Sequence, residues 1–198
     1  MLFHHLVPLH RTHHRGQASA QGYLWARNVH AMPVQLTEFG QLLLHYPIVF
    51  AEDGVPWVLF SLTAGQNPFV DAEGEWRAEC YIPAYARAYP WTWARIQERD
   101  VLAVETTALL PSGTPWLDAM GNFTLEGRAK LKLLDAWREA RASTLLFAEN
   151  LVMQKMLVPC QVMQIDPDHS AKMRGNLGFY RIKTDPRANL SPTLQMVW

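Results

Sequence analysis

The 198-residue sequence is poor in cysteine, in net charge and in long apolar runs. Its cysteines are Cys80 and Cys160 alone, too few for the disulfide framework of a small secreted protein. The 18 basic and 18 acidic residues balance, so nucleic acid is not an expected partner. No apolar run reaches the roughly 18 residues of a membrane helix, and the first residues lack the order of a signal peptide. These absences predict a cytoplasmic protein without membrane insertion.

The sequence also lacks the compact motifs that identify many enzymes. It contains no G-x-S-x-G, H-E-x-x-H, C-x-x-C, Walker or G-x-G-x-x-G pattern. We therefore name no catalytic residue and expect no cofactor. The sequence favours a binding protein over an enzyme.

Apolar residues make up 49% of the chain, enough to bury a sizeable core. At this length we expect one domain spanning residues 1–198, with residues 1–35 forming an irregular N-terminal arm. The predicted fold is α+β, with a mostly antiparallel sheet of about five strands, one long helix in the C-terminal half, and shorter helices packed on it.

The long helix is predicted over residues 125–156, where an apolar stripe recurs at helical spacing. The stripe should pack against the sheet through Leu131, Leu134, Trp137 and Phe147. The opposite, polar side contains Lys130, Lys132, Asp135, Arg138, Glu139 and Arg141. This polar pattern fades after Ser143, where we expect the helix to break.

Alternation of apolar residues and turn signals place the other elements. Strands are predicted at 23–25, 48–50, 57–63, 76–82, 101–110, 158–165 and 177–183, with turns at 53–54, 71–74 and 166–168. Shorter helices are predicted at 37–45 and from Pro83 through Trp93, the second interrupted by Pro90.

One histidine cluster is a candidate for metal binding. His4, His5, His10, His13 and His14 lie within the first fourteen residues, and imidazole is a common metal ligand. No carboxylate or thiol completes a recognised spacing, and no regular period fixes the rings, so we expect a polar arm without metal. If a metal did bind, its candidate ligands would be His10, His13 and His14. The alternative function would then be a metal-dependent enzyme or enzyme subunit, for example in ribosomal peptide modification.

A dense aromatic and basic segment is the candidate binding site. Its members are Tyr85, Arg87, Tyr89, Trp91, Trp93 and Arg95. These residue types dominate the energies of protein interfaces, because each buries a large area while keeping a polar group. Prolines at 83 and 90 stiffen the segment. We therefore predict that part of this segment is exposed and binds a protein or peptide; the alternative is that every aromatic faces the core.

Three blocks of this sequence resemble the SapC family of bacterial proteins. They are Tyr46-Pro47-Ile48-Val49-Phe50, then Asn67-Pro68-Phe69-Val70-Asp71 with Gly74 and Trp76, then Tyr81-Ile82-Pro83-Ala84 with Arg87 and Tyr89-Pro90-Trp91. Weaker likeness extends over residues 7–183, in a chain that looks like a shortened, divergent member. The resemblance implies an accessory protein and provides no catalytic residue.

These observations lead to a functional expectation. We expect a non-catalytic, protein- or peptide-binding partner subunit of a bacterial complex, with a hetero-complex as its working form. The family is named for an association with bacterial surface layers, so a cell-envelope accessory protein is a further alternative.

Overall fold

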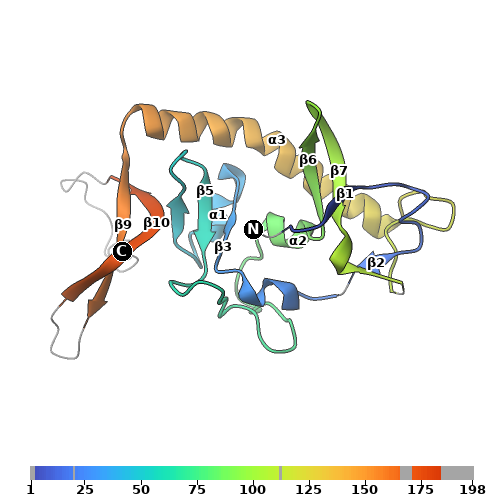
Figure 1. Cartoon of the computed structure of the whole chain (residues 1–198), viewed down its shortest axis with the longest axis horizontal. Coiled ribbons are helices and arrows are strands. Elements are labelled where there is room, and N and C mark those ends of the chain that lie inside the picture. Colours follow the sequence, from blue (N-terminus) through green and yellow to red (C-terminus); the bar gives the residue numbers. More distant parts are fainter. Residues whose placement is uncertain (1–2, 20, 112, 166–170, 184–198) are drawn as a thin grey trace.

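A computed structural model describes residues 3–19, 21–111, 113–165 and 171–183, and it has the predicted α+β fold (Figure 1). Its strands are β1 (Leu6–Pro8), β2 (Ala18–Ser19), β3 (Ala31–Pro33), β4 (Ile48–Phe50), β5 (Pro56–Leu59), β6 (Trp91–Ile96), β7 (Arg99–Glu105), β8 (Leu109–Leu110), β9 (Leu157–Ile165) and β10 (Ala171–Ile182). The α-helices are α1 (Phe39–Leu42), α2 (Ala84–Ala88) and α3 (Leu125–Met153); the 3-10 helices are η1 (Leu24–Asn28), η2 (Leu36–Glu38) and η3 (Thr106–Ala108).

The main sheet has five strands in the order β3-β5-β4-β10-β9, all paired antiparallel. The predicted turn at Asp53-Gly54 connects β4 and β5, and the Asp53 carboxylate accepts the Val55 N–H at 3.0 Å. Gly54 has a φ of +81°, and a Cβ there would lie 2.6 Å from the Ala148 carbonyl oxygen. Glycine is thus required both for the turn and for the close approach of α3.

Residues 1–35, predicted as an irregular arm, contain three short strands. β1 pairs with β7 and extends the three-stranded sheet β1-β7-β6; β2 pairs with β8; β3 forms one edge of the main sheet. Each strand has only two or three residues and pairs with a strand that is distant in the sequence. No local alternation of apolar residues therefore predicts it. The strand predicted at residues 23–25 is wrong, because this segment enters η1.

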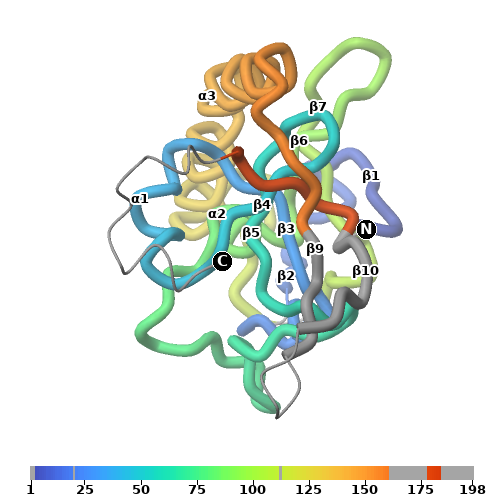
Figure 2. Tube along the Cα trace, turned by 90° about the vertical axis from the view of Figure 1, so that its left-hand side faces the viewer, coloured from blue at the N-terminus to red at the C-terminus, as the bar shows by residue number. Residues whose placement is uncertain are grey.

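The long helix is confirmed: it begins at the predicted residue and ends at Met153, three residues before the predicted end. α3 spans 29 residues and begins after Thr124, whose hydroxyl accepts the Gly127 N–H at 3.1 Å. The break expected after Ser143 does not occur, since Thr144 and Ala148 continue the buried face. In Figure 1, α3 runs along the top of the molecule from the β9–β10 side to the β6–β7 hairpin, and Figure 2 shows it above the strands of the main sheet.

Three clusters of buried side chains form the core. The first includes Val58 and Phe60, the second includes Trp91, Val104 and Trp116, and the smaller third consists of Ala31, Val49, Leu59 and Cys160. α3 contributes Leu151 to the first cluster and Leu134 to the second. The helix therefore connects these two larger clusters.

Two further predictions fail after β5. Residues 76–82 do not form a strand: Trp76 is buried and makes an isolated bridge to Val70, but Ala78 is exposed, so the apparent alternation does not define a buried face. The helix expected from Pro83 to Trp93 ends at Ala88, and β6 begins at Trp91. The predicted turn at 166–168 lies outside the described residues.

Candidate functional site

The six predicted binding residues occupy different surroundings, because the helix-to-strand change at Pro90 turns the backbone between them. Trp91 is 1% exposed and packs edge-on against Trp116, with ring centroids 4.7 Å apart, so it belongs to the core. Three of the others, Tyr85, Trp93 and Arg95, line a groove beneath α3. Arg87 and Tyr89 line a separate pocket. The segment is therefore not one continuous surface.

The groove consists of three adjoining hollows, which we call the aromatic groove. The first, of about 380 Å³, lies between the β6–β7 hairpin and α3, with Trp93 and Arg95 in its wall. The second, of about 260 Å³, shares Trp93, Trp137 and Leu145 with the first. The third, of about 650 Å³, meets the second at Tyr85 and Pro33. The shared residues place the three hollows next to one another.

Aromatic rings form the middle of this groove. The rings of Tyr85 and Trp137 lie 5.7 Å apart, and the Arg138 guanidinium lies 4.3 Å from the Trp93 ring centroid. Burial raises the pKa of Tyr85 to about 12, so its hydroxyl keeps its proton. Among the described residues, no acceptor meets the buried Nε1–H groups of Trp93 and Trp137. Both donors are enclosed in the walls of the groove, so the two indole rings shape the hollows through their apolar surfaces.

The rim of the groove is basic where it meets α3. Arg95 forms ion pairs with Glu98 at 3.0 Å and with Asp100 at 3.6 Å. Arg138 pairs with Asp135 at 3.2 Å. Arg141, in contrast, has no ion pair in the part of the chain that the structure describes, although it lines both the first and second hollows. The second hollow thus offers an unneutralised positive charge.

The third hollow follows the edge of the main sheet. It is lined by residues 28–33, which lead into and include β3, and by Trp57 and Phe179, whose ring centroids lie 6.0 Å apart. In the described chain β3 pairs with β5 alone. A free strand edge beside an apolar hollow can take an extended peptide through backbone hydrogen bonds.

Arg87 is held on the other side of α2 by two hydrogen bonds. Its guanidinium donates to the Tyr81 hydroxyl at 2.8 Å and to the Ile82 carbonyl at 3.0 Å. Tyr81 in turn donates to the buried carboxylate of Glu38 at 3.2 Å. Arg87 is exposed, but these bonds fix its direction, so it is a structural as well as a surface residue.

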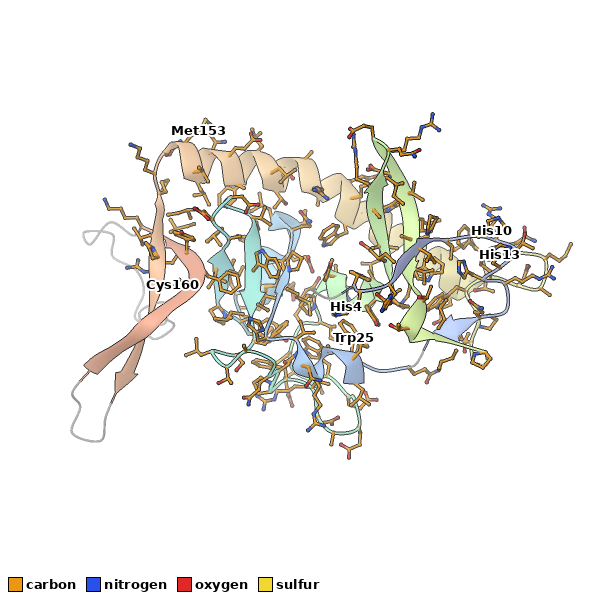
Figure 3. All side chains as sticks on the ribbon, in the orientation of Figure 1. His4, His10, His13, Trp25, Met153 and Cys160 are labelled. Carbon is orange, nitrogen blue, oxygen red and sulfur yellow. The ribbon has the colours of Figure 1, made fainter. Side chains whose placement is uncertain are left out.

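The predicted histidine cluster is divided: Figure 3 shows His4 near the middle of the molecule and His10 and His13 at the end far from the main sheet. The His10 and His13 rings stack at 4.3 Å, and Figure 3 shows both residues on the loop after β1. His14 Nδ1 accepts the His10 N–H at 2.9 Å, and burial, followed by His13 and His10, lowers the pKa of His14. Within residues 3–19, 21–111, 113–165 and 171–183, no group of three or more His, Cys, Asp or Glu side chains is arranged to hold a metal ion.

Sequence reasoning missed the contribution of α3 to the groove. Trp137 was assigned to the core and Arg138 and Arg141 to the solvated side, yet all three line the groove. The signal was available in the spacing of Trp137 and Arg141, which are one helical turn apart and so share a face. Lys130, also expected on the polar side, is half-buried in the separate pocket.

The fold and groove define an α+β protein whose surface hollow is walled by aromatic residues. The chain belongs to the SapC family, since the SapC family model matches residues 9–194. This confirms the resemblance seen at residues 46–91. No curated protein and no solved structure matches the chain significantly. None of the helices in the described residues combines the length and apolarity needed to cross a membrane.

Proposed function

We propose that this SapC family protein is a binding subunit that takes an extended segment of a partner protein into the aromatic groove. The observation that carries the proposal is the row of three adjoining hollows, which share the wall residues Trp93, Trp137 and Tyr85 and extend to β3. A groove of this form suits an extended chain better than a compact small molecule, because the chain can fill successive hollows with successive side chains.

The chemistry of the groove indicates what such a segment contains. Apolar or aromatic side chains would fill the hollows beside Tyr85 and Phe179. An acidic side chain near the middle would pair with Arg141. The rings are already in place, so little ordering opposes binding.

The composition of the groove supports binding more than catalysis. Among its described lining residues the single carboxylate is Asp100, which lies 3.6 Å from Arg95 in an ion pair. General acid–base chemistry needs a group poised to exchange a proton, and a paired, exposed aspartate is a poor candidate. The proposal holds for a partner in the cytoplasm or in the cell envelope, because the features of the groove select a peptide segment and do not depend on its location.

Selection from a phage-displayed random peptide library against the immobilised protein tests this proposal. Selected peptides should combine an acidic residue with aromatic or aliphatic residues and should bind the full chain in solution. Leu145→Arg should abolish their binding, because Leu145 lies in the wall shared by the first two hollows and an arginine there would obstruct both.

Leu146→Arg is the matched control. Leu146 is the next residue on α3, is 60% exposed and does not line the groove, so its substitution should leave peptide binding unchanged. Both variants should melt at the temperature of the unsubstituted protein. Equal binding to the Leu145→Arg variant, or an equal loss in both variants, would show that the peptides bind elsewhere.

A further inference from the structure

A second cavity lies on the other side of α2 from the aromatic groove. It has a volume of about 260 Å³, and its wall combines the N-terminal part of the chain, α2, the loop before α3 and the first turns of α3. Trp25, labelled in Figure 3, stacks on Tyr89 with ring centroids 4.0 Å apart and forms one side. Trp116 and Lys130 contribute another side. We call this cavity the Lys130 pocket.

Lys130 is the distinctive group of this pocket. Its half-buried ammonium donates to the Tyr89 carbonyl oxygen at 2.8 Å and lies 5.4 Å from the centroid of the Trp116 ring. An ammonium has three N–H donors, and the other two find no acceptor among the described residues. Lys130 also forms no ion pair with any described carboxylate, so a half-buried positive charge faces the cavity, with Glu126 nearby but not in contact.

The other charged and titratable groups around the cavity leave it positive. Glu126, on the same helix as Lys130, is exposed and is the carboxylate among the lining residues. Arg87 approaches from α2, and Tyr23 and Tyr89 contribute hydroxyls whose pKa values are raised by burial. Both tyrosines therefore stay neutral near pH 7. Arg87 and Lys130 outweigh the single carboxylate.

The size and surface of the pocket limit the ligand further. The volume of about 260 Å³ is just below the range for drug-sized ligands, which begins at about 300 Å³, so the ligand must be small. Stacked indole and phenol rings favour a flat, apolar body, and the hydroxyl-bearing residues Ser19 and Thr114 can assist an anionic group. The Arg87 guanidinium already donates to the Ile82 carbonyl and the Tyr81 hydroxyl, so Lys130 is the cation available to a ligand. One ammonium matches one negative charge, whereas phosphate is usually held by several donors or by a bidentate arginine. A carboxylate on a small apolar body fits best.

We propose that the Lys130 pocket binds a carboxylate, carried either by a small aromatic acid or by the terminal residue of a peptide. The carboxylate would accept the two free N–H donors of Lys130, and the apolar body would lie against Trp25 and Tyr89. The site is separate from the aromatic groove, so this proposal does not depend on that function.

The protonation of Lys130 gives the site a pH dependence. Burial lowers the pKa of Lys130 to about 8, with Glu126 acting in the opposite direction. A bound carboxylate stabilises the charged form, so binding raises this pKa and takes up protons when it occurs near the free-state value. Affinity should therefore decrease as the pH rises above about 8.

Calorimetry with benzoate as the probe tests the proposal. We expect benzoate to bind the full chain at roughly pH 6.5 and at least about tenfold more weakly at roughly pH 9.5, with benzamide not binding. Lys130→Met should reduce benzoate affinity by about tenfold or more. Lys132→Met, an exposed lysine on the same helix, and Leu145→Arg, in the groove, should leave it unchanged.

Two short peptides that end in phenylalanine, one with a free and one with an amidated C-terminus, separate the sources of the carboxylate. Binding of the free-ended peptide identifies a terminal residue; binding of benzoate without the peptide identifies a small acid. Absence of binding by both, or equal binding of benzamide, overturns the proposal. If Lys130→Met does not fold, NMR titration of Lys130 in the unsubstituted protein decides: benzoate must raise its pKa.

Discussion

Glu38 is a buried carboxylate that holds the start of α2 in place. It is 6% exposed and accepts hydrogen bonds from the Ala84 N–H at 2.6 Å, the Tyr81 hydroxyl at 3.2 Å and the Gln35 N–H at 3.3 Å. Burial raises the pKa of Glu38 in spite of these bonds. By capping a free amide of α2, Glu38 fixes the helix that presents Tyr85 to the groove.

Glu105 performs a similar task at the end of β7 with the opposite electrostatic result. Its carboxylate accepts the N–H groups of His4 at 2.6 Å and His5 at 2.8 Å, and both donors of Thr107. Burial alone would raise the pKa of Glu105, but these hydrogen bonds outweigh it and lower the pKa. The segment before β1 is thereby attached to the second sheet.

The contributions of Glu105 and Glu38 to the free energy of unfolding should depend on pH in opposite directions. Glu105 contributes above its ordinary pKa of 4.5, and the contribution is lost as the pH falls through its lowered folded-state pKa. Glu38 contributes below 4.5, and the contribution is lost as the pH rises through its raised pKa. Urea unfolding of Glu105→Gln and Glu38→Gln across this range should show differences from the unsubstituted protein that change in opposite directions. Parallel changes would contradict the assignment.

Gly127 allows α3 to begin directly against the preceding loop. A Cβ at this position would lie 2.2 Å from the Trp116 carbonyl oxygen, closer than any contact can be. Gly127→Ala should therefore lower the free energy of unfolding by about 1–3 kcal/mol, as overpacking does, although alanine favours helices. Denaturant unfolding provides the measurement.

Gly40→Ala is the matched comparison. Gly40 also lies in a helix, and no atom is within 4 Å of its prospective Cβ. With no steric cost, alanine should raise the free energy of unfolding by about 0.5–1 kcal/mol. A loss of stability in both variants would show that helical geometry, and not the contact with Trp116, decides the effect.

At the scale of elements, α3 offers a direct comparison, because it has leucines on its buried side and on its exposed side. Leu134 is 3% exposed within the second cluster, so Leu134→Ala should cost about 2–5 kcal/mol through the cavity it creates. Leu146→Ala, on the exposed side of the same helix, should change the unfolding free energy by no more than about 0.5 kcal/mol. Similar losses would place Leu146 in a contact that the structure does not contain.

Elements whose signals are local were predictable. α3 has an apolar stripe and a threonine cap, and the β4–β5 hairpin has its Asp53-Gly54 turn. Short strands in the first 35 residues were not, because β1 depends on β7, which lies almost a hundred residues away. The expected strand at 76–82 failed for the converse reason: alternation is present, but Ala78 has no neighbouring strand to bury it.

The candidate site was predictable only in part. Of the residues predicted at 85–95, Tyr85, Trp93 and Arg95 line the aromatic groove, and their role in binding stays a prediction. The residue types did not reveal that Trp91 turns inward, since that depends on Trp116 and Phe123 from a distant loop. Nor could they reveal Lys130, whose burial results from the meeting of α2 with α3.

At the scale of the whole molecule, α3 contacts the two larger core clusters, through Leu151 in the first and Leu134 in the second. We expect the Val58 and Val104 amides, one in each cluster, to exchange hydrogen with the same free energy of opening. Ala142→Pro, between the clusters, should cost about 3 kcal/mol or more and make the two values differ. Hydrogen exchange followed by NMR measures both amides.

Ala142→Gly is the control for this experiment. It weakens the helix by about 1 kcal/mol but leaves its hydrogen bonds intact, so both amides should lose protection equally. If the proline variant also leaves the two values equal, the clusters are coupled through the sheets and not through α3.

The position of Phe3 bears on how this protein should be labelled. Its ring lies 5.7 Å from the rings of both Tyr85 and Tyr89, which line the aromatic groove and the Lys130 pocket respectively. An affinity tag or fluorophore placed beside Phe3 would therefore lie next to one residue of each site. The tag could then occupy the aromatic groove or the Lys130 pocket. A labelled protein would in that case bind its ligand more weakly than the unlabelled protein does.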